Sequence, residues 1–551
     1  MKKSLHKAAT RSRWASSPRT RILALTVALL TLTVTFATGL KSWRAQAGRG
    51  TVAAASRSLG SASPMTAVLA KAAAPMFDSI TVTTTGDGAA NAANCPGTGC
   101  RLRDAIAAAV AGDTITFAVT GTITLTSGEL AIDKNLTIQG PGANVLTISG
   151  NQASRVFRIN GGVTAALNGL TIANGKVSGD GFTQGGGIYL DNGGALTINN
   201  STLSGNSASG DSLTQGGGIF NNGGNLTITN STLSGNAVFG SGSNSSRTHG
   251  GGIFNLGGNL TITNSTLSGN AVFGGTQGGG IFNGRGTVHL VNSTLANNTV
   301  SSDGGGNGGG IANPQSTVYL VNSTLVNNSV TNPGGHGRGG GIADGTVNAK
   351  NSIIAGNTGK SLFFNTTIAS ELDNVTLNNQ GNNLIGGNAQ LGPLQNNGGP
   401  TQTLRPLPGS PAINAGDNCV LTANGCGNNN AALATDQRGI ARPQNSTVDI
   451  GAVEIITDGS PALIPLTIDP AANPAGAAAE LTGAINLANE HPAPTTIRLL
   501  CGTYSYATAQ NWEYGPNALP PITSDITIEG NGAVLDSTAT VRLRFFYVSG
   551  G

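Results

Sequence analysis

Carboxylates are sparse in the central part of the chain, where the sequence is otherwise most regular. Between residues 185 and 357 they are Asp191, Asp211, Asp303 and Asp344. Hydrolysis of a glycosidic bond uses two carboxylates across a cleft, roughly 5 to 9.5 Å apart. β-Elimination on uronates uses a base, often Lys or Arg, together with acids that hold Ca²⁺. The four aspartates are too scattered for either arrangement, so we predict no catalytic residue, no metal ligand and no cofactor.

Aromatic side chains are the stronger candidates for binding. Four of them each follow the Ile of a Gly-Gly-Gly-Ile string, and two more occupy a second position at which alternation turns a side chain outward. Aligned rings offer flat apolar faces on which sugar rings can stack. The predicted carbohydrate-binding residues are Tyr189, Phe220, Phe254, Phe282, His289 and Tyr319. The alternative is that a corner or a projecting loop buries this stripe.

The elements that position these residues are repeats. The Ile of the Gly-Gly-Gly-Ile string stands at positions 188, 219, 253, 281, 311 and 342, in steps of 28 to 34 residues. An Asn-Ser string begins at Asn200, Asn230, Asn264, Asn292, Asn322 and Asn351, and another Asn follows six residues later each time. A regular period of this length indicates a stack of similar units.

Each unit contains short strands with one buried face. In residues 225–230 apolar and polar residues alternate, so that Leu226 and Ile228 point one way and Thr227 and Thr229 the other. One coil cannot bury its apolar side chains alone, but stacking pairs the backbones about 4.8 Å apart and aligns like residues in ladders. Aligned Asn side chains can bond their neighbours along a corner, and Gly runs supply sharp turns. We predict an all-β fold, a parallel β-helix (solenoid) of about 30 residues per coil.

Other segments are predicted to flank the repeats. Residues 101–110 have the pattern of a short helix, which would cap the exposed strand edges of the first coil. The same order returns late, with a helix over 478–489, a strand over 496–500 and an echo of 136–140 at 526–530. We therefore predict a β-helix with its N-terminal cap over 78–400, a terminal module over 401–456, a linker over 457–475, and the truncated start of a second β-helix over 476–551.

The first 50 residues differ in charge from the rest of the chain. They hold ten Lys or Arg and no acid, which accounts for the net charge of +4, since 19 basic and 25 acidic residues remain. The acidic body disfavours nucleic acid as a partner. Residues 22–40 are uncharged and Ala45-Gln46-Ala47 is a candidate cleavage site. We predict an export signal or an uncleaved membrane anchor over 1–47, and an Ala/Ser-rich linker over 48–77.

Five cysteines fit an exported protein. Cys95 and Cys100 close one short loop, and Cys419 and Cys426 close another. We predict a disulfide in each loop, with four free thiols as the alternative. Metal binding is disfavoured because neither spacing is Cys-x-x-Cys and no His is nearby. Cys501 is left over.

Two segments resemble families of exported bacterial proteins. The string C-R-L-R-D-A-I at 100–106 resembles the CSLREAI motif domain, although Arg101 and Asp104 depart from the name string. Residues 409–454 resemble the choice-of-anchor Q domain through S-P-A-I-N-A-G-D at 410–417, D-Q-R-G at 436–439, Arg442-Pro443 and D-I-G-A-V-E at 449–454. The resemblance implies an extracellular bacterial protein with a right-handed β-helix of the pectin-lyase-like kind, and it implies no settled activity.

Together these features predict a secreted or cell-surface, non-catalytic β-helix protein for adhesion. Its expected partner is extracellular polysaccharide or cell-surface matrix. Membrane contact would come only from the N-terminal segment or from an anchor beyond Gly551. The alternative is a polysaccharide lyase or glycoside hydrolase of the pectin-lyase-like fold, with acids supplied from residues 129–191 or from coils beyond Gly551.

Overall fold

The chain is represented by a computed structural model that describes residues 79–240, 248–302, 305–331, 337–360, 367–369, 371–426, 431–456, 467–471, 476–490, 494–509 and 515–549. The predicted export segment 1–47 and the linker 48–77 lie outside these ranges, as does most of the linker 457–475. Within the described ranges, no helix is long and apolar enough to cross a membrane.

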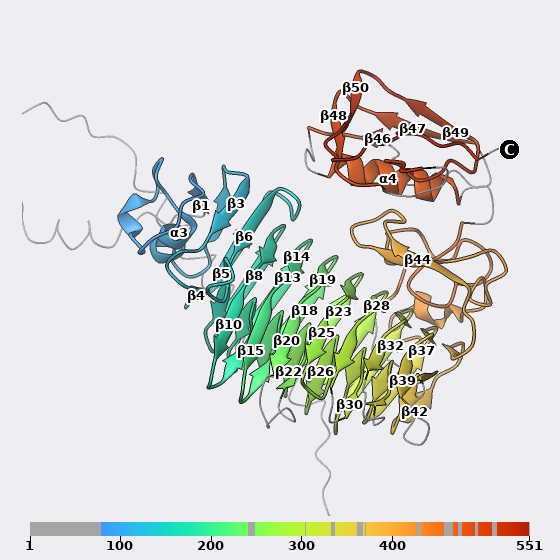
Figure 1. Cartoon of the computed structure of the whole chain (residues 1–551), viewed down its shortest axis with the longest axis horizontal. Coiled ribbons are helices and arrows are strands. Elements are labelled where there is room, and N and C mark those ends of the chain that lie inside the picture. Colours follow the sequence, from blue (N-terminus) through green and yellow to red (C-terminus); the bar gives the residue numbers. More distant parts are fainter. Residues whose placement is uncertain are drawn as a thin grey trace, which may run out of the picture. The chain divides into compact units, whose positions relative to one another are not determined.

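Strands of successive coils pair side by side in parallel sheets that run along the stack (Figure 1). In the described part of the chain, sheet A consists of β1 (Ser79–Val82), β2 (Thr114–Phe117), β5 (Leu136–Gln139), β8 (Thr164–Asn168), β13 (Ala195–Asn199), β18 (Asn225–Thr229), β23 (Asn259–Thr263), β27 (Thr287–Val291), β32 (Thr317–Val321), β37 (Thr346–Lys350) and β42 (Thr376–Asn379). Sheet B consists of β3 (Gly121–Thr124), β6 (Leu146–Ser149), β9 (Thr171–Ala173), β14 (Thr202–Ser204), β19 (Thr232–Ser234), β24 (Thr266–Ser268), β28 (Thr294–Ala296), β33 (Thr324–Val326), β38 (Ile353–Ala355) and β43 (Leu384–Ile385).

Three further sheets complete the coil. Sheet C consists of β4 (Leu130–Ile132), β7 (Phe157–Ile159), β12 (Ile188–Leu190), β17 (Ile219–Asn222), β22 (Ile253–Leu256), β26 (Ile281–Gly284), β31 (Ile311–Ala312), β36 (Ile342–Ala343) and β41 (Leu372–Asp373). Sheet D consists of β10 (Lys176–Gly179), β15 (Ser207–Gly210), β20 (Ala237–Gly240), β25 (Ala271–Phe273), β29 (Thr299–Ser301), β34 (Ser329–Thr331), β39 (Thr358–Lys360) and the antiparallel β40 (Thr367–Ala369). Two-residue strands before the Gly runs form sheet E, namely β11 (Thr183–Gln184), β16 (Thr214–Gln215), β21 (Thr248–His249), β30 (Gly306–Asn307) and β35 (Gly337–Arg338).

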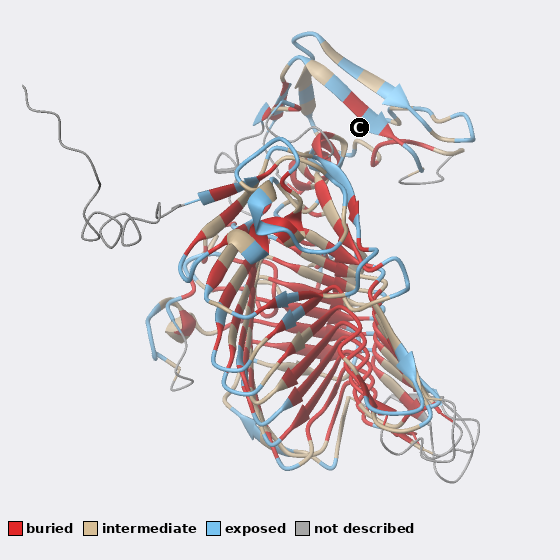
Figure 2. Ribbon diagram, turned by 90° about the vertical axis from the view of Figure 1, so that its left-hand side faces the viewer, coloured by how far each residue is buried: buried red, intermediate tan, exposed pale blue. Residues whose placement is uncertain are grey.

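This arrangement confirms the predicted parallel β-helix. Successive coils are in register, with Leu226 opposite Leu260 and Ile228 opposite Ile262. The inward side chains form one continuous core, which Figure 2 shows as red along the strands, and those of the last coil, such as Leu377 and Ile385, are partly buried. The core is therefore a set of ladders of like residues, each buried by the coil above and the coil below.

The two repeated Asn series have different structural roles at the corners of the coil. The first series, which includes Asn200 and Asn230, has left-handed backbone with φ of 48° at both, a conformation that Asn tolerates better than most residues. The second series is buried, and the side-chain Nδ2 of each Asn donates to the side-chain Oδ1 of the next at 2.9 Å. This ladder runs through Asn206, Asn236, Asn270, Asn298, Asn328 and Asn357. A further buried Asn ladder runs through Asn221, Asn255, Asn283 and Asn313.

The Gly runs serve turn geometry and close approach, as predicted. Gly216 has a φ of +69°, and a Cβ added to Gly217 would lie 2.3 Å from the carbonyl oxygen of Ala237. Any larger residue at Gly217 would push the coils apart, because backbone cannot yield as a flexible side chain does.

The predicted N-terminal cap is present as α3 (Leu102–Ala108), preceded by the short helix η1 (Ala92–Asn94). Its buried residue Asp104 connects these segments. The carboxylate accepts hydrogen bonds from the backbone N–H of Asn91 at 2.7 Å, from Nδ2 of Asn94 at 2.8 Å and from Nε of Arg101 at 2.7 Å. Burial by itself would raise the pKa of Asp104, but these donors outweigh it and hold the pKa at about 2.

Replacing Asp104 by Asn should weaken the cap in a pH-dependent way. Because the folded pKa lies below the unfolded value near 3.8, the carboxylate stabilises the fold above that pH, and the contribution is lost as the pH falls through 2. We expect Asp104→Asn to lower the free energy of opening of α3 by about 2 kcal/mol at pH 6 and to flatten its pH dependence between 4 and 2. Hydrogen exchange of the α3 amides measures this. The exposed Asp133 provides the control, and an equal effect of Asp133→Asn would contradict the prediction.

The segment over 401–456 packs on the outer faces of sheets A and B. Its regular elements are β45 (Thr403–Pro406), which pairs with β44 (Leu391–Gln395), and the short helix η3 (Asn418–Leu421). Outward hydroxyls of three successive sheet B strands anchor it. Thr266 and Thr294 both bond the side-chain amide of Gln437, and Thr324 accepts from the backbone N–H of Ala452.

The residues that carry the resemblance to the choice-of-anchor Q domain form a buried ionic network within this segment. Arg438 binds Asp436 at 2.9 Å, and Arg442 binds Glu454 at 2.7 Å, with all four side chains fully buried. These residues therefore have a structural role in holding the module together. The family assignment itself stays a prediction.

The last described elements form a separate small core. They are β46 (Thr467–Ile468), α4 (Ala477–Ala488), β47 (Thr495–Leu499), β48 (Gly502–Tyr506), β49 (Ile526–Glu529) and β50 (Ala533–Ser537), with parallel pairing throughout. The helix and the first long strand lie where the sequence predicted them. The interpretation of this segment as the start of a second β-helix stays a prediction.

The structure contains both predicted disulfides. Cys95 is bonded to Cys100, and Cys419 is bonded to Cys426. Among the described cysteines, Cys501 is free and exposed.

Candidate functional site

The aromatic residues that follow the repeated Ile form a stack, as the sequence predicted. Ring centroids of Tyr189 and Phe220 are 5.1 Å apart, those of Phe220 and Phe254 are 5.1 Å apart, and those of Phe254 and Phe282 are 4.8 Å apart. The rings come from β12, β17, β22 and β26, which are neighbours in sheet C.

The three phenylalanines of this stack are buried, so they lack the exposed ring faces on which the prediction of sugar binding depends. Phe220, Phe254 and Phe282 are 2 %, 3 % and 8 % exposed. His249 of sheet E stacks on Phe282 at 4.7 Å, so the segment before each Gly run helps to cover the rings. Tyr189, at the end of the stack, lies half-buried under the guanidinium groups of Arg155 and Arg158. The alternative stated for this stripe, burial at a corner, is the one that the structure supports.

The second pair of predicted aromatic residues, His289 and Tyr319, lies in a different environment. They face outward from β27 and β32 of sheet A, with centroids 4.6 Å apart and planes within 6° of parallel. Both are half-buried. They line a cavity of about 460 Å³ between sheet A and residues 431–435 of the terminal module, a volume within the usual range for small-ligand sites.

Both walls of this cavity, which we call the His289–Tyr319 pocket, are held in place by packing. Leu433 is buried against Val321, Val420 and Val448, which fixes the module wall on sheet A. Asn292 donates from Nδ2 to the carbonyl oxygen of Thr435 at 2.7 Å and so joins the two walls. The pocket is therefore preformed, and binding would require little ordering of the chain.

Two side-chain carbonyl oxygens of residues that line the pocket have no hydrogen-bond partner within the protein. They are the Oδ1 atoms of Asn264 and Asn292, both buried, and both residues line the pocket. Asn292 as a whole is only 2 % exposed. A buried acceptor without a donor costs about 1–3 kcal/mol, but neither oxygen has exposed surface that a ligand in the pocket could contact.

The remaining lining of the pocket is neutral. It consists of hydroxyls such as those of Thr261 and Thr263 and of apolar residues such as Val291 and Val321. Burial lowers the pKa of His289 and so favours the uncharged imidazole. The pocket thus offers a stacked aromatic pair and hydroxyl groups, and none of its described lining residues is Asp, Glu, Lys or Arg.

Comparisons with known proteins give the following. No family model matches the sequence, and no curated protein matches it significantly. A solved structure described as pectate lyase Pel9A is similar with a TM-score of 0.33 and 16 % identity, over 68 % of this chain and 97 % of that one. The PL6 family alginate lyase AlyGC is similar with a TM-score of 0.16 and 12 % identity, over 81 % of this chain and 73 % of that one. Likeness at these levels does not bear on activity.

The carboxylates named from the sequence do not assemble into a site. Asp191 binds Arg158 at 3.5 Å, and Asp344 accepts from Asn374. Asp211 lies on a Gly/Ser-containing turn, and Asp303 lies outside the described residues. In the described part of the chain, no group of three or more His, Cys, Asp and Glu residues is placed to hold a metal ion.

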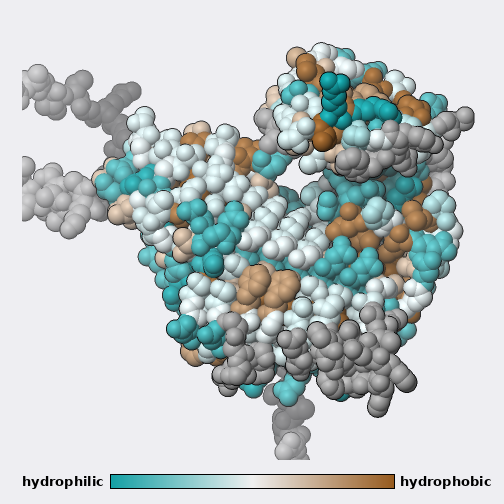
Figure 3. All heavy atoms as spheres, in the orientation of Figure 1, coloured by the Kyte–Doolittle hydropathy of each residue, from teal (hydrophilic) through white to brown (hydrophobic). Residues whose placement is uncertain are grey.

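One exposed aromatic pair was missed in the sequence. Phe239 and Phe273, on β20 and β25 of sheet D, are stacked at 5.2 Å and are 43 % and 39 % exposed. Figure 3 shows an apolar patch over these strands, surrounded by neutral and hydrophilic residues. The signal was the repeated string Asn-Ala-Val-Phe, in which the buried Val238 and Val272 turn the following Phe outward.

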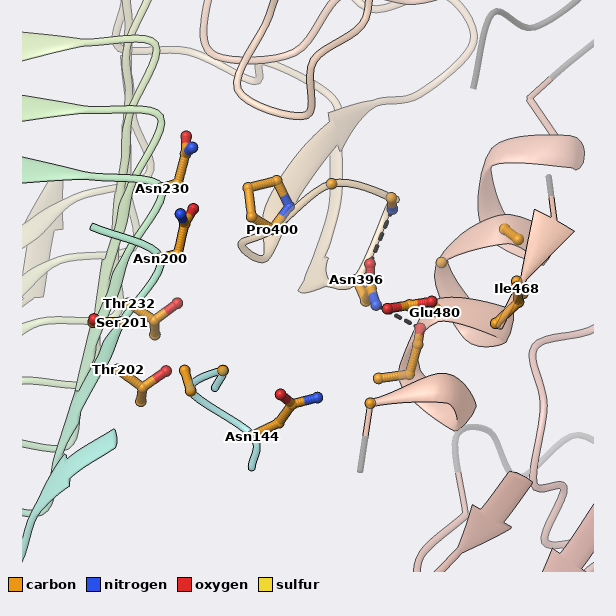
Figure 4. Close-up of a pocket in the computed structure, with 18 of the residues that line it drawn as sticks. Asn144, Asn200, Ser201, Thr202, Asn230, Thr232, Asn396, Pro400, Ile468 and Glu480 are labelled. Atoms are coloured by element: carbon orange, nitrogen blue, oxygen red, sulfur yellow. Dashed lines mark hydrogen bonds between the residues drawn. The ribbon is translucent and has the colours of Figure 1, made fainter. Parts of the chain in front are cut away.

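A larger cavity lies on the corner between sheets A and B. It has a volume of about 740 Å³ and is lined by polar corner residues, including Asn200, Thr202, Asn230 and Thr232 (Figure 4). Asn396 on its other wall donates to the carbonyl oxygen of Ala479 and accepts from the backbone N–H of Gly398. Those polar groups of Asn396 are thus already paired, unlike the acceptors of the His289–Tyr319 pocket.

Proposed function

We propose that the chain is an extracytoplasmic polysaccharide-binding protein, and that a glycan binds without turnover in the His289–Tyr319 pocket. The β-helix acts as a rigid scaffold, and the terminal module supplies the second wall of the pocket. Adhesion to a matrix or cell surface would follow from this binding.

The observation that carries the proposal is the combination of a half-buried aromatic pair with neighbouring hydroxyl groups in one pocket. The stacked rings of His289 and Tyr319 line the pocket together with the hydroxyl-bearing side chains of Thr261 and Thr263. Sugars have apolar ring faces and a rim of hydroxyl donors, so they match both features.

The extracytoplasmic location is supported by the chemistry of the chain. Two disulfides are typical of oxidising compartments. The basic, apolar N-terminal segment predicted to direct export lies outside the described residues.

Replacing Tyr319 by Ala tests the proposal. We expect Tyr319→Ala, and separately His289→Ala, to weaken binding of oligosaccharides at least about tenfold, which corresponds to about 1.4 kcal/mol. Isothermal titration of the purified full chain, after a glycan array has identified a bound oligosaccharide, measures the loss.

Phe273→Ala is the matched control, since it removes an exposed, stacked ring from sheet D and leaves the pocket intact. It should bind as the unchanged chain does. Binding that depends on Phe273 and not on Tyr319 would contradict the assignment of the pocket.

A polysaccharide lyase is the second candidate, because a Tyr lies beside two guanidinium groups. Arg155 and Arg158 lie 5.1 and 5.4 Å from the ring of Tyr189. However, Arg155 is paired with Glu129 and Arg158 with Asp191. Burial also raises the pKa of Tyr189, which opposes a phenolate base. Unsaturated products from pectin or alginate, formed by the full chain and lost in Tyr189→Phe, would favour this candidate.

A further inference from the structure

We infer that the His289–Tyr319 pocket selects uncharged glycans over uronate polymers. This inference rests on the proposed function and names the class of its ligand. The first step is the absence of a counter-ion: among the described residues that line the pocket, none is Asp, Glu, Lys or Arg. A uronate carboxylate entering the pocket would lose hydration without gaining a cation, which is costly.

The nearest cation in the same ladder is already engaged. Lys350 lies beside Val321 in the register of sheet A. Its Nζ donates to Oδ2 of Asp417 at 2.7 Å and to the carbonyl oxygen of Gln380 at 2.9 Å, and its side chain is almost fully buried. Recruiting Lys350 to a uronate would break these bonds, so it does not supply the missing charge.

Binding of matched oligosaccharides to the full chain tests this inference. We expect at least one of the hexasaccharides of glucan, mannan, xylan or galactan to bind at least about tenfold more tightly than the hexasaccharides of polygalacturonate and alginate. The preferred binding should require Tyr319 and change little between low and high salt, because no ion pair forms.

A gain-of-charge variant sharpens the test. Thr263 lines the pocket and is partly exposed, so Thr263→Lys should raise affinity for polygalacturonate in a salt-sensitive way, whereas the matched Thr263→Gln should not. Tyr319-dependent binding of uronates by the unchanged chain would overturn the inference and leave the proposed function standing. Binding of none of these glycans would overturn both.

Discussion

Replacing Asn270 by Ala is expected to lower the free energy of unfolding of the β-helix by about 3–6 kcal/mol. Asn270 is completely buried, and its side-chain amide donates to the carbonyl oxygen of Leu233 at 3.0 Å and to Oδ1 of Asn298 at 2.9 Å. Its own Oδ1 accepts from the backbone N–H and from Nδ2 of Asn236. Ala would break these four buried hydrogen bonds, each of which contributes about 0.5–1.5 kcal/mol.

Denaturant unfolding followed by circular dichroism, with hydrogen exchange to locate the damage, measures this loss. The matched control is Asn259→Ala in the same coil, because Asn259 is exposed and makes a single ladder bond to Asn225 at 3.2 Å. The control should change stability by less than about 0.5 kcal/mol. Similar small effects at both positions would show that the buried ladder is not what holds the coils in register.

The fold was predictable because the alternation within each strand and the spacing between repeats both indicate the same stack of coils. Alternation in 225–230 assigned Leu226 and Ile228 to the inside, and both are buried. The steps between repeated residues placed like side chains opposite one another, and the register of Leu226 with Leu260 confirms this. The different roles of the two Asn series were not predictable. The sequence does not show which series has the left-handed backbone at a corner and which forms the buried ladder.

The site was only partly predictable, because alternation tells which way a side chain points but not what covers it. Phe254 and Tyr319 are both turned outward, yet His249 and the neighbouring rings cover Phe254, while Tyr319 faces a cavity. The second wall of that cavity comes from residues 431–435, more than a hundred positions along the chain from Tyr319. Contacts over such a distance have no local pattern. The exposed Phe239 and Phe273, by contrast, did have one.

The terminal module should depend on Arg442 in a way that changes with pH. Arg442 and Glu454 are both fully buried and are joined at 2.7 Å, and the guanidinium also donates to the carbonyl oxygens of Asp449 and Gly451. Replacing Arg442 by Met leaves the Glu454 carboxylate without its cation. Breaking a buried pair in this way is expected to cost about 3–5 kcal/mol.

The pH dependence of this cost follows from the burial of Glu454. Burial raises its pKa to about 7 even though Arg442 pulls it down. Because the folded pKa lies above the unfolded value near 4.5, the contribution of Glu454 to stability is fully present below pH 4.5 and is lost as the pH rises through 7. Without Arg442 the pKa of Glu454 in the folded state rises further, so the contribution of Glu454 to stability continues to fall up to a higher pH. The deficit of Arg442→Met should therefore be small at pH 5 and large at pH 8.5.

Hydrogen exchange of the amides of Ile450 and Gly451 at both pH values measures this deficit. The Ile450 amide bonds the carbonyl oxygen of Ala412, and the Gly451 amide reaches that of Asn351 in the β-helix, so both report on opening of the module. Arg442→Lys keeps the charge but loses hydrogen-bond donors. Its stability should lie between those of the unchanged chain and Arg442→Met, and its deficit should depend less on pH than that of Arg442→Met. A deficit of equal size at pH 5 and pH 8.5 would mean that Arg442 acts by packing alone. In that case the ionic network would not be what fixes the module wall of the His289–Tyr319 pocket.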